Sequence, residues 1–515
     1  MSAFPSRAPL LPEIMALHGH WRADRDAVVC DNERWSWARF CEDNHRFAHG
    51  LHSIGVQPGD RVGVFMENGY PMLTALFGTL AAGAASVPLN TSVSDDAIVA
   101  MLGDAGIKVL IVSACFTGRF DALRERLPDV TCLSDLPAAG WTGMAEIAAG
   151  QPTHRPEIDL SDDAPLNIIY SSGTTGLPKG ILHTHAGRRD WAYDLAIALR
   201  YHSAARTLLT IGLYSNISWV AMLCTLLAGG TLVVERRFDA AVFLDRVAQS
   251  RITHTAMVPI QYQRVIDAQR AEPRDLSSMQ AMMSCGSPLH QGLKRDIFDV
   301  FPCGIIELYG LTEGIITTLD PEDAEGRWAS VGKPLIGTDI RIVGEDDTAL
   351  PRGETGEIVS RGRITMPGYW QRDDANAEAR WVDPQGAVWL RSGDIGYLDE
   401  QGFLYIVDRK KDMILSGGQN IYPQDIEAVL VTHESIEDVA VIGVPSERWG
   451  ETPLALVVPR DERLSMDALL DWANQRLGKQ QRLAGCIAVT ELPRNPNGKI
   501  LKRELRKQYG DSANG

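Results

Sequence analysis

Residues Ile168 to Gly180 read Ile-Ile-Tyr-Ser-Ser-Gly-Thr-Thr-Gly-Leu-Pro-Lys-Gly, and this stretch decides how the whole chain is interpreted. The apolar residues at its start predict a buried strand, and the small and hydroxylated residues that follow predict a loop. Glycines let the backbone approach a ligand closely, while hydroxyls and a lysine offer hydrogen-bond donors and a positive charge. Such groups bind polyphosphates, so we predict a phosphate-binding loop formed by Ser171, Ser172, Gly173, Thr174, Thr175, Gly176 and Lys179.

The loop is not a Walker A motif. Pro178 stands where a glycine should precede the lysine, and Gly180 stands where a serine or threonine should follow it. A glycine-rich surface turn is the plainer alternative for any single match of this kind. Because three glycines, four hydroxyls and a lysine gather directly after a strand, phosphate binding is the better interpretation.

Composition narrows the class of protein. The chain has 515 residues, which is enough for more than one domain, and its net charge of −16 argues against a nucleic-acid or anionic-membrane binder. Its eight cysteines are scattered without metal-binding spacing and predict reduced thiols. There is neither an apolar signal core nor an apolar run long enough to span a membrane, so we expect a cytoplasmic protein.

The pattern of apolar residues predicts an α/β fold. Helix-like and strand-like segments alternate from residue 37 to residue 113, which indicates parallel-rich sheets covered by helices. From about residue 330 to 408, short strands with glycine turns predict a β-rich subdomain. We place a boundary after Asp408, so that residues 1–408 form a large N-terminal domain and residues 409–515 a small α+β domain.

Three further motifs carry chemistry. Tyr309-Gly-Leu-Thr-Glu313 places a carboxylate behind a glycine turn at the end of a strand, where it is suited to hold Mg²⁺. Arg391-Ser-Gly-Asp-Ile-Gly-Tyr397 offers Asp394 as an acceptor for two ribose hydroxyls. Asn497-Gly498 predicts a turn that projects Lys499. Taken singly, a helix cap, a strand-end turn and a solvated basic tail are the plainer alternatives.

In this order, the four motifs resemble the signatures of the adenylate-forming (AMP-binding) superfamily, and the chain is similar over almost its whole length to the acyl-CoA synthetases within it. The resemblance implies that Tyr309 stacks on adenine, that Thr312 contacts the α-phosphate and that Thr175 and Glu313 serve the metal. Asp394 then binds ribose, and Arg409 contacts ribose or phosphate. Lys499 bridges the substrate carboxylate and the α-phosphate, as the adenylation catalyst.

The resemblance also implies a mobile C-terminal domain. After adenylation, Lys499 would block the attacking thiol, and in the family this domain rotates about a hinge residue, which corresponds to Lys411. The rotation brings a glycine-rich segment toward the thiol, and on this basis Gly417 and Gly418 are expected on the coenzyme A side.

We therefore expect an ATP-dependent, AMP-forming acid–CoA ligase that uses ATP, Mg²⁺ and coenzyme A. Asn216 occupies the position of the aspartate that pairs with the ammonium group in amino-acid-activating relatives, so a non-amino, apolar acid, fatty or aromatic, is favoured. Ser215 replaces the histidine of many acid–CoA ligases, so the resemblance does not predict the shape of the acyl pocket. The candidate residues of the acyl pocket are Asn216, Trp219, Ile260, Gln261, Gly310, Leu311 and Ile316.

Other interpretations stay open. One is an enzyme that loads the pantetheine arm of a carrier protein, and another is a non-catalytic nucleotide- or acyl-binding homologue. An intact Lys499, Glu313 and Asp394 argue against the latter, and the missing Walker A motif argues against another type of ATP-cleaving enzyme. Luciferase-like oxygenation is not excluded by the motifs. We expect a small-molecule acid and coenzyme A as partners, no nucleic acid, and a homodimer among the options for assembly.

Overall fold

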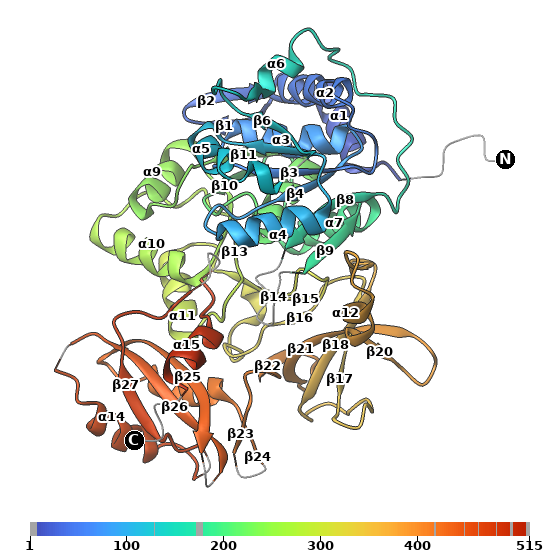
Figure 1. Ribbon diagram of the computed structural model, residues 1–515. Coiled ribbons are helices and arrows are strands. Elements are labelled where there is room, and N and C mark those ends of the chain that lie inside the picture. The colour runs from blue at the N-terminus through green and yellow to red at the C-terminus, as the bar shows by residue number, and fades with distance from the viewer. Residues whose placement is uncertain are drawn as a thin grey trace. The chain divides into compact units, whose positions relative to one another are not determined.

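A computed structural model describes residues 8–510, apart from residues 128, 171–178, 417–418, 447–448, 462, 480 and 495–497 (Figure 1). The chain divides into two compact units. The first unit comprises the described residues of Met1–Trp328, Pro334–Asp339 and Arg361–Arg380. The second unit comprises those of Ala329–Lys333, Ile340–Ser360 and Trp381–Gly515. The β-rich segment is thus grouped mainly with the C-terminal part of the chain, while the domain boundary after Asp408 stays a prediction.

An eight-stranded sheet carries the predicted phosphate-binding stretch. Its strands are parallel from β8 through β7 and antiparallel where β9 joins β8 and β19. The central strands are apolar and buried on both faces, because helices cover the sheet. In spatial order the strands are β19 (Gly368–Tyr369), β9 (Gly180–Thr184), β8 (Pro165–Tyr170), β4 (Ala85–Pro88), β3 (Arg61–Phe65), β5 (Val109–Val112), β6 (Thr131–Ser134) and β7 (Thr142–Gly143).

A nine-stranded sheet completes the strand framework of the first unit. It is parallel from β14 to β1 and has antiparallel pairs of β15 with β14 and of β2 with β1. In order, its strands are β16 (Lys333–Pro334), β15 (Ile316–Leu319), β14 (Ile306–Gly310), β13 (Ala281–Ser284), β12 (His254–Met257), β10 (Arg206–Leu209), β11 (Thr231–Val234), β1 (Asp26–Cys30) and β2 (Glu33–Ser36).

Helices pack around these sheets. Helices α2 and α3, drawn in blue in Figure 1, pack against each other, as do α7 and α8. Helix α8 is buried along its length because it is apolar nearly all round. The helices are α1 (Leu11–Trp21), α2 (Trp37–Ser53), α3 (Tyr70–Ala81), α4 (Asp95–Ala105), α5 (Thr117–Asp121), α6 (Met144–Ala148), α7 (His185–Ala198), α8 (Asn216–Ala228), α9 (Ala240–Ser250), α10 (Pro259–Ala271), α11 (Gln291–Val300) and α12 (Asp373–Glu378), with single turns at Ala114–Phe116, Arg124–Arg126 and Pro321–Asp323.

The second unit contains two small sheets. The first has its own apolar core around Trp381 and Trp389. Its strands are β17 (Thr338–Val343), β18 (Gly356–Gly362), β21 (Val388–Leu398) and β20 (Arg380–Val382), with β22 (Leu404–Arg409) paired to β21.

The second small sheet buries one apolar face against α13 and α14 and the other against α15. Pro423 opens α13, because a proline lacks the backbone donor that the first helical turn leaves unused. The elements are β24 (Gln419–Ile421), β23 (Ile414–Ser416), β26 (Gly450–Pro459), β25 (Ile436–Ser446) and β27 (Gly485–Ala488), with α13 (Pro423–Leu430), α14 (Met466–Asn474) and α15 (Lys502–Tyr509).

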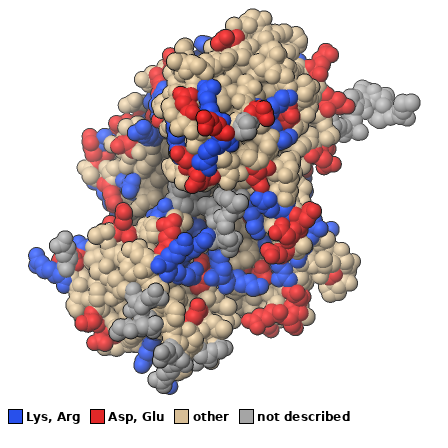
Figure 2. Space-filling model, in the orientation of Figure 1, with Lys and Arg blue, Asp and Glu red and all other residues tan. Residues whose placement is uncertain are grey.

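The predicted fold class is confirmed, with parallel-rich sheets, helical layers and a C-terminal α+β part. Strand β14 continues through Tyr309 and Gly310 into the motif, because β15 pairs antiparallel with these residues. Acidic and basic side chains are intermixed on the face seen in Figure 2. Among the described helices, none has both the length and the apolar character that crossing a membrane requires.

Candidate active site

The predicted phosphate-binding loop connects two paired strands. Tyr170 at the end of β8 pairs with Gly180 at the start of β9, so the segment between them joins an antiparallel hairpin. A Cβ atom at Gly180 would lie 2.8 Å from Ile168 and 3.1 Å from the Tyr170 ring, so only glycine fits there. The predicted site residues Ser171, Ser172, Gly173, Thr174, Thr175 and Gly176 lie outside the described residues.

Tyr369 links the loop lysine to the predicted metal ligand. The Lys179 ammonium lies 4.9 Å from the centre of the Tyr369 ring, and the Tyr369 hydroxyl donates a hydrogen bond of 3.0 Å to Oε1 of Glu313. Burial and the neighbouring Glu313 charge raise the pKa of Tyr369, so the phenol stays protonated and remains a donor. Tyr369 was not predicted from the sequence, where its only signal is its place between Gly368 and Trp370.

The segment that follows β14 is a tight turn. The Leu311 amide donates to the Ile315 carbonyl at 2.9 Å, and the Gly314 amide donates to the Leu311 carbonyl at 3.0 Å. Gly314 has a φ of +112°, and a Cβ there would lie 2.4 Å from the Ile364 carbonyl oxygen. The turn therefore requires glycine at this position and holds Thr312 and Glu313 in one geometry.

A second network anchors the end of β8. The Tyr170 hydroxyl donates to Oδ2 of Asp104 at 2.7 Å, and Arg372 donates to Oδ1 of the same carboxylate at 2.6 Å. Asp104 thus ties the strand before the phosphate-binding loop to the segment that follows Tyr369. All three residues of this network lie within the first unit.

In the second unit, the residue predicted to bind ribose forms an ion pair. Asp394 on β21 lies opposite Arg409 on β22, and Nε of Arg409 is 2.7 Å from Oδ1 of Asp394. The Asp394 side chain is buried. Because a carboxylate offers only acceptors, the arginine fixes how it can face hydroxyl donors.

Lys499 belongs to the same group of charges. It is half-buried and follows Gly498, whose φ of +78° lies in the left-handed region that favours glycine, while Asn497, the other residue of the predicted turn, lies outside the described residues. Burial and repulsion by Arg409 lower the pKa of Lys499 to about 8, while attraction by Asp394 opposes this shift. The second unit thus brings three of the predicted site residues into electrostatic contact.

Lys411 is exposed and lies in the turn after β22, where the Asp412 amide donates to the Arg409 carbonyl at 2.9 Å. A turn between two sheets is a suitable place for a hinge, because a change of φ and ψ there leaves the ladders of both sheets intact. Gly417 and Gly418 lie outside the described residues.

The candidate acyl-pocket residues have different environments. Trp219 and Ile316 are buried in the main core, and Asn216 is half-buried at the start of α8. Ile260 is 44% exposed on α10, while Gln261 accepts a hydrogen bond of 3.2 Å from the Val258 amide and so caps that helix. Gly310 and Leu311 lie at the end of β14 and in the turn after it.

Ser215, which replaces the usual histidine, has a structural role. Its hydroxyl accepts a hydrogen bond of 3.3 Å from the Ile217 amide and caps the N-terminus of α8. The structure also reveals a buried arginine on α7, Arg188, which donates to Oδ1 of Asn216 at 2.8 Å. Arg188 was not predicted, although it falls three residues before Trp191 and seven before Leu195, on the buried face of the helix.

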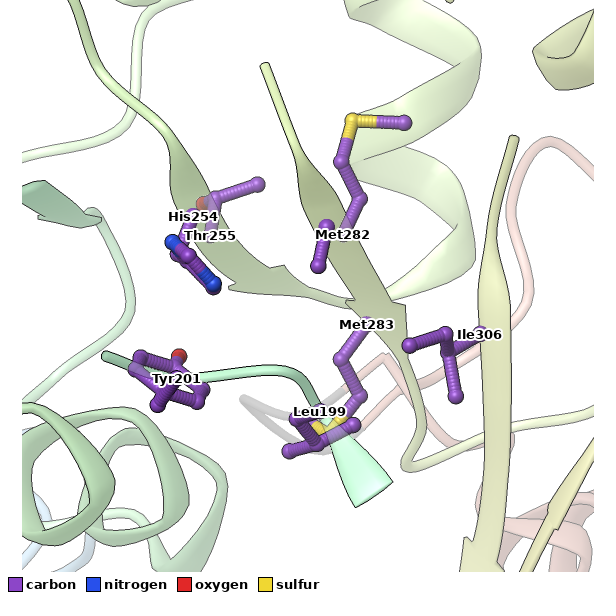
Figure 3. Close-up of a pocket in the computed structure, with 8 residues that line it drawn as sticks. Leu199, Tyr201, His254, Thr255, Met282, Met283 and Ile306 are labelled. Carbon is purple, nitrogen blue, oxygen red and sulfur yellow. The ribbon is translucent and has the colours of Figure 1, made fainter. Parts of the chain in front are cut away.

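A small hollow lies elsewhere in the first unit. Figure 3 shows His254 and Thr255 on β12, Met282 and Met283 on β13 and Ile306 on β14 around it, with Leu199 and Tyr201 on the other side. The Tyr201 and His254 rings stack at 4.3 Å. The hollow offers no volume to a water molecule, so it is a feature of core packing rather than a ligand site.

Two regions of the chain match known protein families. Residues 18–370 match the AMP-binding enzyme family, and residues 425–499 match the AMP-binding enzyme C-terminal domain. The long-chain-fatty-acid–CoA ligase FadD13 of Mycobacterium tuberculosis is 32% identical over 485 residues, covering 92% of this chain and 93% of that protein. A feruloyl-CoA synthase of Amycolatopsis is 36% identical over 481 residues, covering 90% and 92%.

A solved structure is similar over nearly the whole chain. The o-succinylbenzoate CoA synthetase MenE of Bacillus subtilis, in complex with the acyl-adenylate intermediate OSB-AMP, superposes with a TM-score of 0.85 at 27% identity. The match covers 96% of this chain and 97% of that chain.

Proposed function

The chain belongs to the AMP-binding enzyme family, in its acid–CoA ligase branch, and from this membership we propose that it joins a non-amino, apolar carboxylic acid to coenzyme A at the expense of ATP. In the first step the acid becomes an acyl-AMP and pyrophosphate leaves. In the second step the thiol of coenzyme A attacks the acyl-AMP, and AMP leaves.

The observation that carries the proposal is the grouping of Asp394, Arg409 and Lys499 in the second unit. Adenylation needs a carboxylate that binds ribose and a cation that binds ribose or phosphate. It also needs a second cation near the reacting oxygens. We assign these roles to the three residues in that order.

Adenylation depends on positioning and on charge neutralisation. The substrate carboxylate attacks the α-phosphorus in line, and negative charge develops on the phosphoryl oxygens. Lys499 is a compact cation on a flexible stem and neutralises this charge. In the first unit, Tyr309 stacks on the adenine, Thr312 contacts the α-phosphate, and Lys179 serves the phosphates with the hydroxyls and amides of the predicted loop.

The residues around Glu313 suit Mg²⁺ by their donor chemistry. Mg²⁺ prefers carboxylate oxygens, and the Glu313 carboxylate is oriented by the Tyr369 hydroxyl at 3.0 Å, as outer-shell partners orient metal ligands. We assign Glu313 and Thr175 to the ion. When bound, Mg²⁺ neutralises charge on the phosphate oxygens.

Thioester formation needs Lys499 to leave the reacting carbonyl. We propose that the domain after Asp408 rotates about Lys411 and brings Gly417 and Gly418 to the coenzyme A side. Hinge residues absorb changes in φ and ψ at element boundaries, and Lys411 lies at such a boundary.

The nature of the acid follows from the candidate pocket. Trp219 and Ile316 are apolar and buried, and Asn216 offers no negative charge to an ammonium group. We therefore propose that the substrate is a fatty or aromatic acid. We also propose a cytoplasmic location and coenzyme A as the acyl acceptor. A carrier-protein acceptor and a homodimeric assembly stay as alternatives for experiment.

The test is product detection by mass spectrometry with Mg²⁺-ATP and a panel of short, medium, long and aromatic acids, each with and without coenzyme A. We expect acyl-AMP from at least one acid and its thioester only when coenzyme A is present. Acyl-AMP that never passes to coenzyme A would indicate a carrier-protein loader. No adenylate from any acid would contradict the proposal and favour a non-catalytic homologue.

A further inference from the structure

Arg188 is a buried cation that has no acidic partner among the described residues. Three lysine or arginine side chains of the described part are buried, namely Arg188, Arg189 and Lys294. Arg189 pairs with Asp190 at 2.9 Å, and Lys294 pairs with Glu307. No described carboxylate forms an ion pair with Arg188, which is 1% exposed on α7.

The immediate partners of Arg188 are uncharged. Nη2 donates to Oδ1 of Asn216 at 2.8 Å, and Nε donates to Oδ1 of Asn167 at 3.3 Å. The guanidinium carbon lies 4.4 Å from the ring centre of Trp191 and 5.7 Å from that of Trp219. Two amides and two indoles solvate a cation only in part, and an uncompensated buried charge is costly.

The surroundings hold further buried nitrogen atoms. Nδ2 of Asn167, Nε1 of Trp219 and Nε2 of His183 make no hydrogen bond within the described part of the chain. Asn167 and His183 lie opposite each other on β8 and β9, against which α7 packs (Figure 1). Amide and indole nitrogens are donors, so the cluster has more donors than acceptors.

Burial lowers the pKa of Arg188 to about 9, and burial together with the Arg188 charge lowers the pKa of His183 well below its usual value. A nearby anion would oppose the lowering of the Arg188 pKa, because it stabilises the charged guanidinium. The ligand that suits this cluster is acceptor-rich and negatively charged. A carboxylate offers two acceptor oxygens that match the guanidinium fork.

We propose that Arg188 binds a second carboxylate of the acid substrate, so that the enzyme prefers an acid with a carboxyl group at each end of an apolar body. The inference rests on the proposed ligase function, since it identifies the substrate of that same site. Asn216, which we assign to the acyl pocket, is one hydrogen bond from the guanidinium. The indoles of Trp191 and Trp219 suit the apolar body between the two carboxylates.

The test compares matched pairs of acids that share one carbon skeleton, one member with a single carboxyl group and the other with a second at the far end. We expect kcat/KM of the native enzyme to favour the dicarboxylic member of at least one pair by about 100-fold or more. Arg188→Met should lower kcat/KM for that acid by about 100- to 1,000-fold and lower it far less for the monocarboxylic member of the pair. Arg188→Lys should retain part of the preference, because it keeps the charge without the fork.

Thermal unfolding gives a readout that does not depend on turnover. The dicarboxylic acid should raise the Tm of the native protein and not that of Arg188→Met. The variant itself should unfold at no lower temperature, because it removes an uncompensated buried charge. Arg34→Met is the matched control, since Arg34 is exposed and pairs with Asp26 at the surface; it should keep the preference.

Three outcomes would overturn the inference. The first is an equal kcat/KM for the two acids of every pair. The second is an equal loss of kcat/KM for both acids in Arg188→Met. The third is a higher kcat/KM for a hydroxyl- or keto-bearing acid than for the dicarboxylic acid. If no acid yields acyl-AMP, the ligase function fails instead. The Tm shift then still decides whether Arg188 binds a carboxylate, because a shift absent from the native protein contradicts it.

Discussion

Asp394 and Arg409 lie opposite each other on the paired strands β21 and β22, and Nε of Arg409 is 2.7 Å from Oδ1 of Asp394. The carboxylate is 2% exposed, so its orientation is set by the protein and not by water. An acceptor that is oriented before the ligand arrives loses little entropy on binding. The Asp394 carboxylate is therefore preorganised to accept hydrogen bonds from a hydroxyl-bearing ligand.

We expect Asp394→Asn to raise KM for ATP by about 10- to 100-fold, because a hydrogen bond to a charged acceptor contributes about 1.5–3 kcal/mol. The asparagine keeps the size of the side chain and removes its charge. KM for ATP and for the acid would be measured by pyrophosphate release. KM for the acid should stay unchanged, and an unchanged KM for ATP would contradict the ribose assignment.

Tyr369→Phe tests the hydrogen bond to Glu313. The change removes one hydroxyl and keeps the ring that faces Lys179. We expect the concentration of Mg²⁺ needed for half-maximal acyl-AMP formation to rise by about 10-fold, since outer-shell partners of metal ligands have effects of about 10- to 100-fold. Tyr397→Phe, on a different sheet, is the control. An unaltered Mg²⁺ requirement would show that Tyr369 does not orient a metal ligand.

The sequence predicted the elements that depend on local patterns. Helix α3 and strands β3 and β4 follow from apolar spacing, and the positive φ of Gly498 follows from its residue type. Local pattern fails where distant segments meet. The contact of Tyr369 with Glu313 joins residues 56 positions apart, and no periodicity encodes it.

The surroundings of the candidate acyl-pocket residues also depend on contacts between distant segments. Ser215 departs from the usual histidine, and its role as the cap of α8 depends on where that helix begins. Arg188 has helical spacing with Trp191, but a basic residue in a helix is normally exposed. Its burial depends on the packing of α7 against α8, β8 and β9, which is a tertiary property.

We expect Lys499→Ala to slow acyl-AMP formation by about 100- to 1,000-fold or more, by analogy with the loss of one preorganised donor to a developing charge. Single-turnover mixing with ATP and acid would measure this step alone. Transfer from added acyl-AMP to coenzyme A serves as the control and should be little affected. Acyl-AMP formation at the native rate would remove Lys499 from the mechanism.

The pH dependence of adenylation should report Lys499. Burial and the Arg409 charge lower the pKa of its ammonium group to about 8. Because the protonated form is the active one, kcat/KM for acyl-AMP formation should be constant below this pKa and fall by about tenfold per pH unit well above it. In Lys499→Arg the charge persists, so the alkaline decrease should disappear. A decrease retained in that variant would assign it to another group.

The proposed hinge depends on backbone rotation at Lys411. Proline fixes φ and removes the amide hydrogen, so Lys411→Pro should restrict rotation at the turn after β22. We expect acyl-AMP formation to be retained and thioester formation from that acyl-AMP to be impaired by about 10-fold or more, on the scale of other conformational steps that limit turnover. Lys411→Ala is the matched control, because it removes the side chain and leaves the backbone free, and both steps should then proceed normally. Equal loss of both steps in the proline variant would contradict the hinge, since a hinge serves only the passage from one step to the next.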